Sequence, residues 1–324
     1  MTKKIVIAVF ILSNIMQSKA QDILVYNQYL TNPFLYNPAW AGSTTYDELR
    51  GSHREQWVGI QDAPTTQTLS FQKKFRNVGL GANLYNDQNG RTGYQGFELA
   101  YAYHLQLSNY KAVKKQNMLV FGLSLSMHHY KVDVNDLMSE NYDPALDGDK
   151  TSAWVPAMNF GLLYRNGHYN LGLSVTQLLS KSIKFGDIEA ESVKPGTVYL
   201  FNSYDLQVSS LLEVSPSILI KYNQNNEKQF DAGLKTTYRG NFGTNIWFGI
   251  FYRGMLDSVS VMGNAIIANA GIVFNRYYFG YTYEMSLSDL KTYNSGTHEI
   301  TVGYNFGGRQ QRNLKNPAYR PGEN

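Results

Sequence analysis

The carboxylates best placed to bind a ligand lie in one short stretch of the chain, at Asp133, Asp136, Glu140, Asp143, Asp147 and Asp149. Carboxylate oxygens suit calcium, and Asp143, Asp147 and Asp149 share part of the spacing of an EF-hand loop. An EF-hand needs a helix on each side, and no helical pattern flanks this stretch. We therefore favour a solvated acidic loop, with a calcium site at Asp143, Asp147 and Asp149 as the alternative.

Histidine offers a second possibility for metal binding, because His128 and His129 are adjacent. They fall in an alternating segment typical of a β-strand, where neighbouring side chains point to opposite faces. The pair therefore cannot chelate one ion. No nucleophile elbow, Walker loop, dinucleotide fingerprint or zinc-protease motif occurs in the chain. We expect no enzyme activity and no cofactor.

The first twenty residues resemble an export signal. Lys3 and Lys4 precede an apolar run over residues 5–12, and Ser18-Lys19-Ala20 supplies small residues for cleavage. The run is far shorter than the roughly 20 residues that span a bilayer. We predict a signal peptide over 1–20, cleaved between Ala20 and Gln21, with an uncleaved membrane anchor as the alternative.

Cleavage would also change the charge of the protein. The chain has a formal net charge of +4, and the signal peptide removes three lysines and no acid, which leaves +1. Residues 307–324 form a basic tail with Arg309, Arg312, Lys315 and Arg320. The remainder is slightly acidic, so nucleic acid is not an expected partner.

Composition narrows the fold class further. The 324 residues include no cysteine, which excludes disulfide scaffolds and thiolate metal sites. Charged residues make up 17%, against about 25% in average soluble domains. A mean hydropathy of −0.35 argues against a bundle of membrane helices. The high content of Tyr (25 residues) and Gly (28 residues) favours a β-protein.

Alternation of apolar and small polar residues is the main structural signal. In one segment Phe97, Leu99 and Tyr101 alternate with Glu98 and Ala100. About fourteen segments show such a pattern, near 47–57, 66–75, 77–86, 94–106, 118–131, 156–166, 168–178, 196–207, 212–223, 228–239, 243–253, 259–274, 276–285 and 297–306. Many are about 10 residues long, which suits a tilted membrane-spanning strand.

The second face of these strands distinguishes a barrel from a soluble sandwich. It carries Gly, Ser, Thr and Asn rather than the many Lys and Glu of a water-exposed sheet. Aromatic residues near segment ends fit the interfacial girdles of a membrane barrel, namely Tyr130, Tyr164, Tyr222, Tyr238 and Tyr252. We therefore predict an all-β fold over residues 45–306, a transmembrane antiparallel β-barrel of about 14 strands. Short turns should be periplasmic and longer loops external, the longest over 131–154 and 178–195.

Residues 21–44 do not show the alternating pattern of a strand. Asn32-Pro33 and Asn37-Pro38 favour turns, while Phe34, Tyr36 and Trp40 make the segment too apolar for a free linker. It is either a periplasmic lead-in packed on the barrel rim or a plug inside the lumen.

Several motifs, taken in order, resemble one family: Gln28-Tyr29, Asn37-Pro38-Ala39-x-Ala41-Gly42, Arg54-x-Gln56-Trp57-x-Gly59, Ala63-Pro64-x-Thr66-x-Thr68-x-Ser70, Val78-Gly79-Leu80-Gly81, Asn86-Asp87-x-x-Gly90, Asp143-Pro144, Asn159-Phe160-Gly161 and Gly172-Leu173-Ser174-Val175-x-Gln177-Leu178. The family is PorP/SprF, outer-membrane proteins associated with the type IX secretion system. The likeness covers nearly the whole mature chain. It departs at Trp40, where a smaller residue is expected, and at Ala157-Met158 after Pro156.

The resemblance implies a non-enzymatic role in the outer membrane of a Gram-negative cell. Family members look like components that contact periplasmic lipoproteins, or that secrete and hold large surface proteins such as gliding adhesins, through the C-terminal domain of the secreted protein. Candidate partner-binding residues are Asn37, Pro38, Trp40, Gly42, Arg54, Trp57, Gly59 and Pro64. Rim packing and turn formation are the alternative roles of these residues. A passive porin is the alternative function.

Overall fold

The computed structural model describes Asn27, Tyr29 and residues 31–44, 46–107, 117–133, 152–179, 183–185, 188–190, 196–224, 226–240, 243–256 and 264–307. Its described elements are η1 (Pro33–Leu35), η2 (Pro38–Trp40), β1 (Asp47–Glu55), β2 (Thr65–Phe75), β3 (Val78–Asn89), β4 (Thr92–Gln106), β5 (Asn117–Val132), β6 (Ser152–Asn166), β7 (Tyr169–Thr176), β8 (Ile183–Phe185), β9 (Ile188–Ala190), β10 (Thr197–Tyr204), β11 (Leu206–Gln207), β12 (Leu212–Asn223), β13 (Lys228–Arg239), β14 (Asn245–Met255), β15 (Ala265–Phe274), β16 (Tyr277–Ser286), η5 (Asp289–Thr292) and β17 (Thr297–Phe306).

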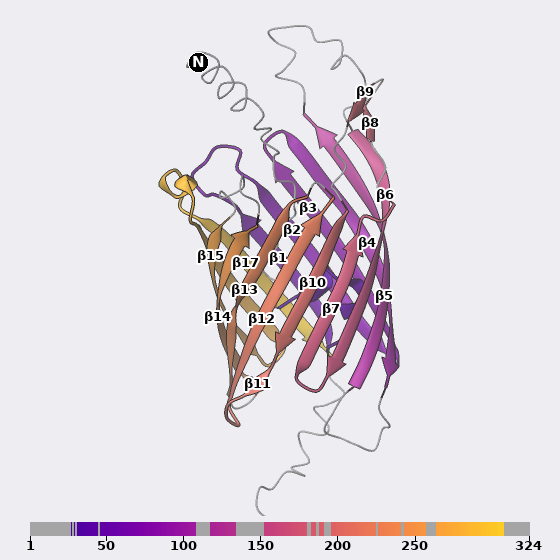
Figure 1. Cartoon of the computed structure of the whole chain (residues 1–324), viewed down its shortest axis with the longest axis vertical. Helices are drawn as coiled ribbons and strands as arrows, with labels where there is room; N and C mark the ends of the chain where they lie inside the picture. The colour runs from indigo at the N-terminus through magenta and orange to yellow at the C-terminus, as the bar shows by residue number, and fades with distance from the viewer. Residues whose placement is uncertain are drawn as a thin grey trace, which may run out of the picture.

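All described strands except β8 and β9 form one antiparallel sheet that closes on itself (Figure 1), and β8 and β9 pair only with each other. Each long strand pairs with the next long strand of the sequence, and β1 pairs with β17 from Asp47 opposite Phe306 to Glu55 opposite His298. Fourteen long strands, with the two-residue β11 beside β12, make a barrel without an open edge. Closure is what lipid requires, because a free edge would leave backbone groups unpaired. The predicted 14-strand barrel is confirmed.

The two faces of the wall follow the predicted alternation. Leu99 and Leu125 are 59% exposed on the outer face, whereas Ala102 and Ser124 on the inner face are almost completely buried. Tyr222, Tyr238 and Tyr252 are exposed near strand ends, and Tyr164 is half-buried. The outer face is therefore apolar and the inner face small and polar, as a lipid-facing barrel requires.

One residue of the expected aromatic girdle points the other way. Tyr130 packs inside the barrel against Tyr94, with ring centroids 4.7 Å apart. It has the same parity along β5 as His128, which is buried inside, while His129 lies on the outer face beside Trp154. The prediction for Tyr130 was wrong because its nearness to the strand end was weighed above its register.

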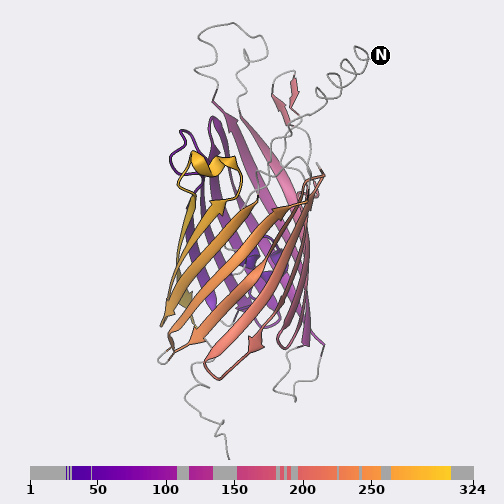
Figure 2. The same cartoon turned by 60° about the vertical axis from the view of Figure 1, so that its left-hand side comes forward.

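The two ends of the barrel carry connections of different length. At the end where β1 begins and β17 finishes, three hairpins are closed by residues 76–77, 167–168 and 275–276, and the longest connection is 107–116. At the opposite end the long connections are 133–151, 177–196 and 287–296, and they include the β8–β9 hairpin and η5 (Figure 2). We call these the short-turn end and the long-loop end. In outer-membrane barrels short turns are periplasmic and long loops external.

Some of the sequence predictions concern residues outside the described part of the chain. These are the signal peptide over 1–20, nearly all of the tail over 307–324, and the calcium candidate Asp143, Asp147 and Asp149. No helix in the described ranges is long and apolar enough to cross a membrane, a finding that says nothing of strands.

Candidate functional site: the segment inside the lumen

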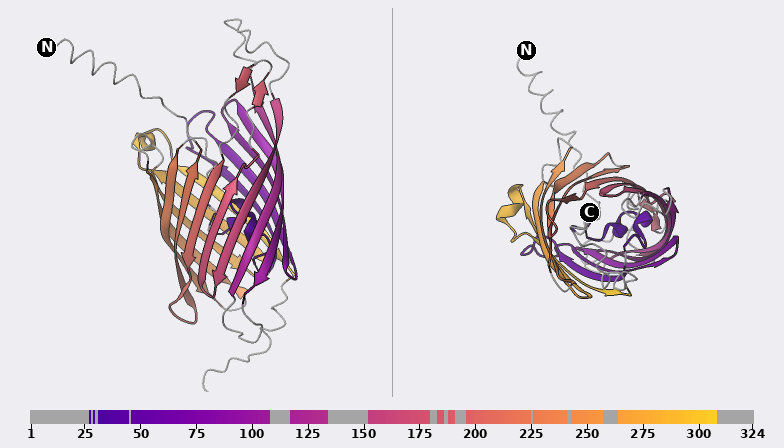
Figure 3. Two further views of the ribbon diagram at one scale, coloured as in Figure 1. Left: turned by 45° about the vertical axis from the view of Figure 1, so that its right-hand side comes forward. Right: turned by 90° about the horizontal axis from the view of Figure 1, so that it is seen from below.

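The segment before β1 lies inside the ring of strands (Figure 3, right). Two Asn-Pro steps each start a short 3₁₀ turn, because proline suits the first helical position and lacks the N–H that would be left unpaired there. The Asn37 side chain caps the second turn by accepting a hydrogen bond from the Ala39 backbone N–H at 2.9 Å. The segment is thus held compact by its own local sequence.

Inward-facing glycines of the wall make room for this segment. A Cβ at Gly81 would lie 2.4 Å from the Phe34 ring, and one at Gly122 would lie 2.2 Å from the Ala39 nitrogen. Gly79 and Gly161 are approached in the same way by Ala41 and Asn37. These four glycines, on β3, β5 and β6, form a shallow groove that only residues without a side chain could provide. We call it the glycine groove.

Polar bonds fix the segment against the same wall. The Asn37 amide donates to the carbonyl oxygens of Leu162 and Leu173 at 3.1 and 3.3 Å. The Asn32 amide donates to Ser70 Oγ at 2.9 Å. Asn37 therefore both caps its own turn and joins it to β6 and β7.

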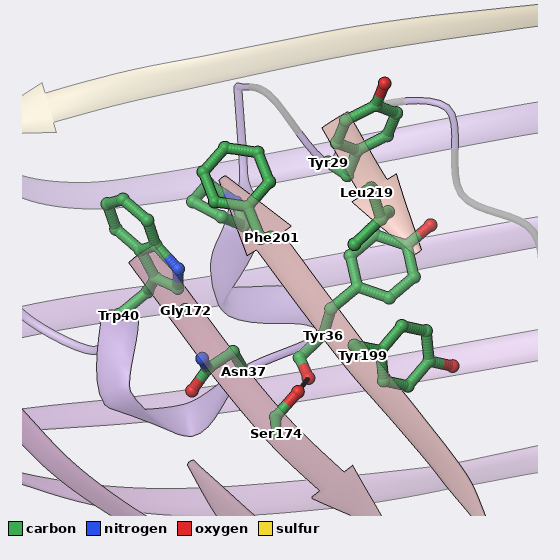
Figure 4. A pocket seen from close by; sticks show the side chains of 10 residues that line it. Tyr29, Tyr36, Asn37, Trp40, Gly172, Ser174, Tyr199, Phe201 and Leu219 are labelled. Carbon is green, nitrogen blue, oxygen red and sulfur yellow. Dashed lines mark hydrogen bonds between the residues drawn. The ribbon is translucent and has the colours of Figure 1, made fainter. Parts of the chain in front are cut away.

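On the other side, aromatic rings fill the space between the segment and the β7, β10 and β12 wall (Figure 4). Tyr36 packs on Tyr199 with ring centroids 5.1 Å apart, and Ser174 Oγ donates to the Tyr36 carbonyl oxygen at 2.7 Å. Tyr29 contacts Phe201 edge-on. The remaining cavity is about 10 Å³, room for a single water.

A buried group of charges holds the start of the described segment. Arg253 forms ion pairs with Asp231 and Glu284, each at 3.0 Å, and donates to the Asn27 side-chain oxygen at 2.8 Å. The Asn27 amide donates to Glu284 at 2.7 Å, and its backbone N–H donates to Glu299 at 3.1 Å. Asn27 is therefore bound on three sides by charged groups of the wall.

Two further cations complete this group. Arg54 pairs with Glu284 at 3.3 Å, and Lys221 lies 3.7 Å from Asp231. All are almost fully buried, with Lys221 and Asp231 at 0% exposure. Buried charges are tolerated only when they are paired and hydrogen-bonded, and removing one partner leaves the other uncompensated. We call Arg54, Lys221, Asp231, Arg253, Glu284 and Glu299 the charged latch.

The segment runs along the lumen from one end toward the other. Asn27 contacts Glu284, close to the long-loop end of β16, whereas the Ala41 carbonyl oxygen lies 3.0 Å from His104 Nε2, close to the short-turn end of β4. The described residues of 27–44 therefore cross most of the height of the barrel.

The structure places the eight predicted partner-binding residues in separate regions. Asn37 and Pro38 lie in the glycine groove, whereas Trp40 lies on the aromatic side, edge-on to Phe201. Gly42 lies beside Gly79 near the short-turn end with a φ of +64°. Arg54 belongs to the charged latch. The others, Trp57, Gly59 and Pro64, lie in the β1–β2 connection at the long-loop end.

Sequence reasoning missed most of the charged latch and the role of the inward glycines. A usable signal existed for the latch, because Asp231, Arg253 and Glu284 are charged residues on strand faces that otherwise carry small neutral side chains. The glycines gave no such signal, since glycine is common on the inner face of any barrel. Only their distance from residues 34–41 reveals their purpose.

Within the described ranges no group of three or more His, Asp or Glu side chains is arranged to hold a metal ion. The charged latch satisfies its own carboxylates with Arg, Lys and Asn. Its chemistry is that of a structural network.

Fold and lumen together define an outer-membrane β-barrel whose interior is occupied by its own N-terminal segment. Residues 18–304 match the family model described as type IX secretion system membrane protein PorP/SprF, so the chain belongs to this family, as its motifs predicted. No curated protein sequence matches the chain.

Solved structures resemble the fold at low sequence identity. The chain is similar to the CymD monoaromatic hydrocarbon channel at 12% identity and a TM-score of 0.54, with 91% of this chain and 96% of that one covered. The toluene transporter TbuX of Ralstonia pickettii matches at 11% identity and a TM-score of 0.49, with coverage of 84% and 92%. At such identities the likeness to CymD shows a common barrel fold and nothing about what is bound.

Proposed function

We propose that this barrel is a non-enzymatic part of the type IX secretion system that anchors, or helps to secrete, a large cell-surface protein of the gliding-adhesin kind. Contact with periplasmic lipoproteins of the system belongs to the same proposal. Membership of the PorP/SprF family associates the chain with the type IX secretion system. The occupied lumen is the observation that favours an anchor over a channel.

The occupied lumen matters because of the size of the barrel. Fourteen strands about 4.8 Å apart, tilted by about 40°, put the backbone about 14 Å from the axis. Such a barrel would leave a water-filled bore if only wall side chains entered it. Here Phe34, Ala39 and Ala41 fill part of it and are at most 2% exposed.

The β1–β2 connection is the proposed contact for the surface protein. Trp57, Gly59 and Pro64 lie there at the long-loop end, and Trp57 and Gly59 adopt positive φ values of 52° and 104°. The Trp57 backbone N–H donates to Thr297 Oγ1 at 3.3 Å, which joins the connection to β17. A fixed loop of this kind can present an aromatic side chain to a partner.

Secretion by the native host tests this role. In a strain without the gene, a large surface protein should be lost from the cell surface, and Trp57→Ala should reduce the amount retained without lowering barrel levels. The natural control is Trp154→Ala, on the lipid-facing wall and 61% exposed. An unchanged surface proteome in the deletion strain would contradict the proposal.

A passive porin is the second candidate, favoured by the width of the barrel. Planar-bilayer recordings distinguish the two, since wild-type protein should show no large stable currents. A variant lacking residues 27–43 should conduct, because every strand pairing is retained while the lumen is cleared. Large stable currents from the wild type would favour the porin.

A further inference from the structure

The connection that contains η5 lies outside the wall of the barrel. Seen from below, the yellow coil of η5 stands beyond the ring of strands (Figure 3, right), and in Figure 1 it lies past the left-hand edge of the wall. The connection joins β16 to β17 over residues 287–296, all of which the structure describes. It therefore overlooks the lipid around the barrel rather than the mouth of the lumen.

The height of this connection follows from β16. The outward side chains of β16 and of the first residue after it are all apolar or aromatic: Tyr277, Phe279, Tyr281, Tyr283, Met285 and Leu287. Ten residues separate the first of these from the last. At about 3.4 Å per residue and a tilt of about 40° they rise about 26 Å, and the apolar band of an outer-membrane barrel is about 25 Å tall. Leu287 therefore lies at the edge of the hydrocarbon, and η5, which begins at Asp289, lies at the level of the lipid headgroups.

Two apolar side chains of the connection are exposed. Tyr293, which directly follows η5, is 73% exposed, and Leu287 is 39% exposed. Exposed apolar groups that lie together mark contact surfaces. The charged residues of the connection are one acid and one base, Asp289 and Lys291, so its net charge is zero. The contact it favours is apolar and aromatic rather than ionic.

The aromatic girdle of the lipid-facing wall continues into this connection. Tyr281 hydrogen-bonds to His298 Nδ1 at 2.7 Å, and the Tyr283 ring lies 5.3 Å from the His298 ring. The same Tyr283 ring packs against Gly296, where a Cβ would lie 2.5 Å from it. The wall that faces lipid and the η5 connection thus form one continuous surface.

Hydrogen bonds hold the connection in this position. The Val58 N–H donates to the Gly296 carbonyl oxygen at 2.9 Å, and the Ser295 N–H donates to the Val58 carbonyl oxygen at 2.8 Å. Inside the connection, the Gly296 N–H donates to Asn294 Oδ1 at 2.7 Å, and the Asn294 amide donates to the Leu290 carbonyl oxygen. The exposed tyrosine is therefore carried on a fixed backbone that is also bonded to the β1–β2 connection.

We propose that the η5 connection is a foot on the membrane surface, with Tyr293 and Leu287 inserted among the lipid headgroups. A tyrosine at this level gains apolar contact with lipid while its hydroxyl stays in contact with water. Because Val58 is bonded to the foot, the β1–β2 connection is held at the membrane surface as well, whatever protein it binds.

A protein bound at Tyr293 is the other candidate occupant of this surface. The position of the connection outside the wall favours lipid, because lipid surrounds the barrel at that level. The packing of Gly296 on the girdle residue Tyr283 favours lipid for the same reason.

Quenching of a fluorescent label tests the inference, since the chain has no native cysteine. Full-length Tyr293→Cys is labelled with nitrobenzoxadiazole and placed in phosphatidylcholine nanodiscs. A lipid with a nitroxide on its headgroup should reduce the emission, as it should for Met285→Cys on the lipid-facing wall, while aqueous iodide should have little effect. The matched control is Asn89→Cys, exposed at the same end of the barrel but with the inward parity of Tyr85 along β3. Iodide should quench this label and the nitroxide lipid should not.

A second variant keeps the tyrosine in place. Ser295→Cys is exposed on the same connection, and its label should be quenched by the nitroxide lipid. Addition of Tyr293→Asp should reduce that quenching, and quenching that does not change would contradict the role of the tyrosine. If the label at 293 behaves like the label at 89, the foot is refuted and Tyr293 faces water, where a protein could bind it. Quenching is independent of secretion by the host, so this proposal and the proposed function can each fail alone.

Discussion

Enlarging one glycine of the groove should loosen the segment inside the lumen. In Gly122→Ala the new Cβ would lie 2.2 Å from the Ala39 nitrogen and 2.5 Å from the Pro38 carbonyl carbon. Ordinary van der Waals contact begins at 3.4 Å, so the segment must move by about 1.2 Å. Both obstacles are backbone atoms, which cannot rotate away as a side-chain tip can.

The cost of this displacement follows from overpacking. Adding a methyl to a well-packed interior costs about 1–3 kcal/mol. If that cost falls on the seated state of the segment, the displaced state becomes about fivefold to hundredfold more populated. The wall itself should persist, because its hydrogen bonds run between strands and not through residues 27–44.

Cysteine labelling measures the displaced population, since the chain has no native cysteine. Ser174→Cys places a single thiol on the wall beneath Tyr36, at a position only 1% exposed. Its reaction rate with a maleimide should increase by about fivefold or more when Gly122→Ala is added.

The matched control is Gly51→Ala in the same Ser174→Cys background. A Cβ at Gly51 would meet its nearest neighbours at 3.8 Å, so no movement is needed. Heat-modifiable electrophoretic mobility reports whether both barrels are folded. Labelling rates in folded Gly122→Ala within twofold of folded Gly51→Ala would refute the idea that the glycine groove seats the segment.

Two further changes test the polar contacts of the segment. Arg253→Gln should lower the free energy of unfolding by about 3–5 kcal/mol, because Asp231 and Glu284 lose the cation that compensates them. The control is Arg239→Gln, which removes a cation that is 51% exposed and should cost under about 1 kcal/mol. Equal denaturation midpoints for the two variants would contradict this prediction. Asn37→Ala should cost about 1–2 kcal/mol through the lost cap and wall bonds. In the Ser174→Cys background, Asn37→Asp should leave the thiol more reactive toward the maleimide than Asn37 does. The carboxylate keeps the cap but cannot donate hydrogen bonds to the wall carbonyls.

The sequence alone determined the wall of the barrel. Alternation has a period of two and is local, so Phe97, Leu99 and Tyr101 reveal the lipid face without any knowledge of the strand partners. The strand count followed in the same way. The error at Tyr130 arose where position near a strand end was trusted over parity along β5.

The interior was decided only by the tertiary structure. Two Asn-Pro steps predicted turns in residues 21–44 but left open whether the segment packs on the rim or enters the lumen. Placing Ala39 on Gly122 requires residues far apart in the chain to meet, and so does placing Asn27 among Arg253, Glu284 and Glu299.

The same distinction explains the charged latch. The sequence contains Asp231, Arg253 and Glu284 on three different strands, and only the folded barrel brings Arg253 to 3.0 Å from both carboxylates. The alternation involves residues that are close together in the sequence, so the sequence alone reveals it. Closure of β1 on β17 sets which distant residues share a lumen or a rim, and only the folded barrel contains that information.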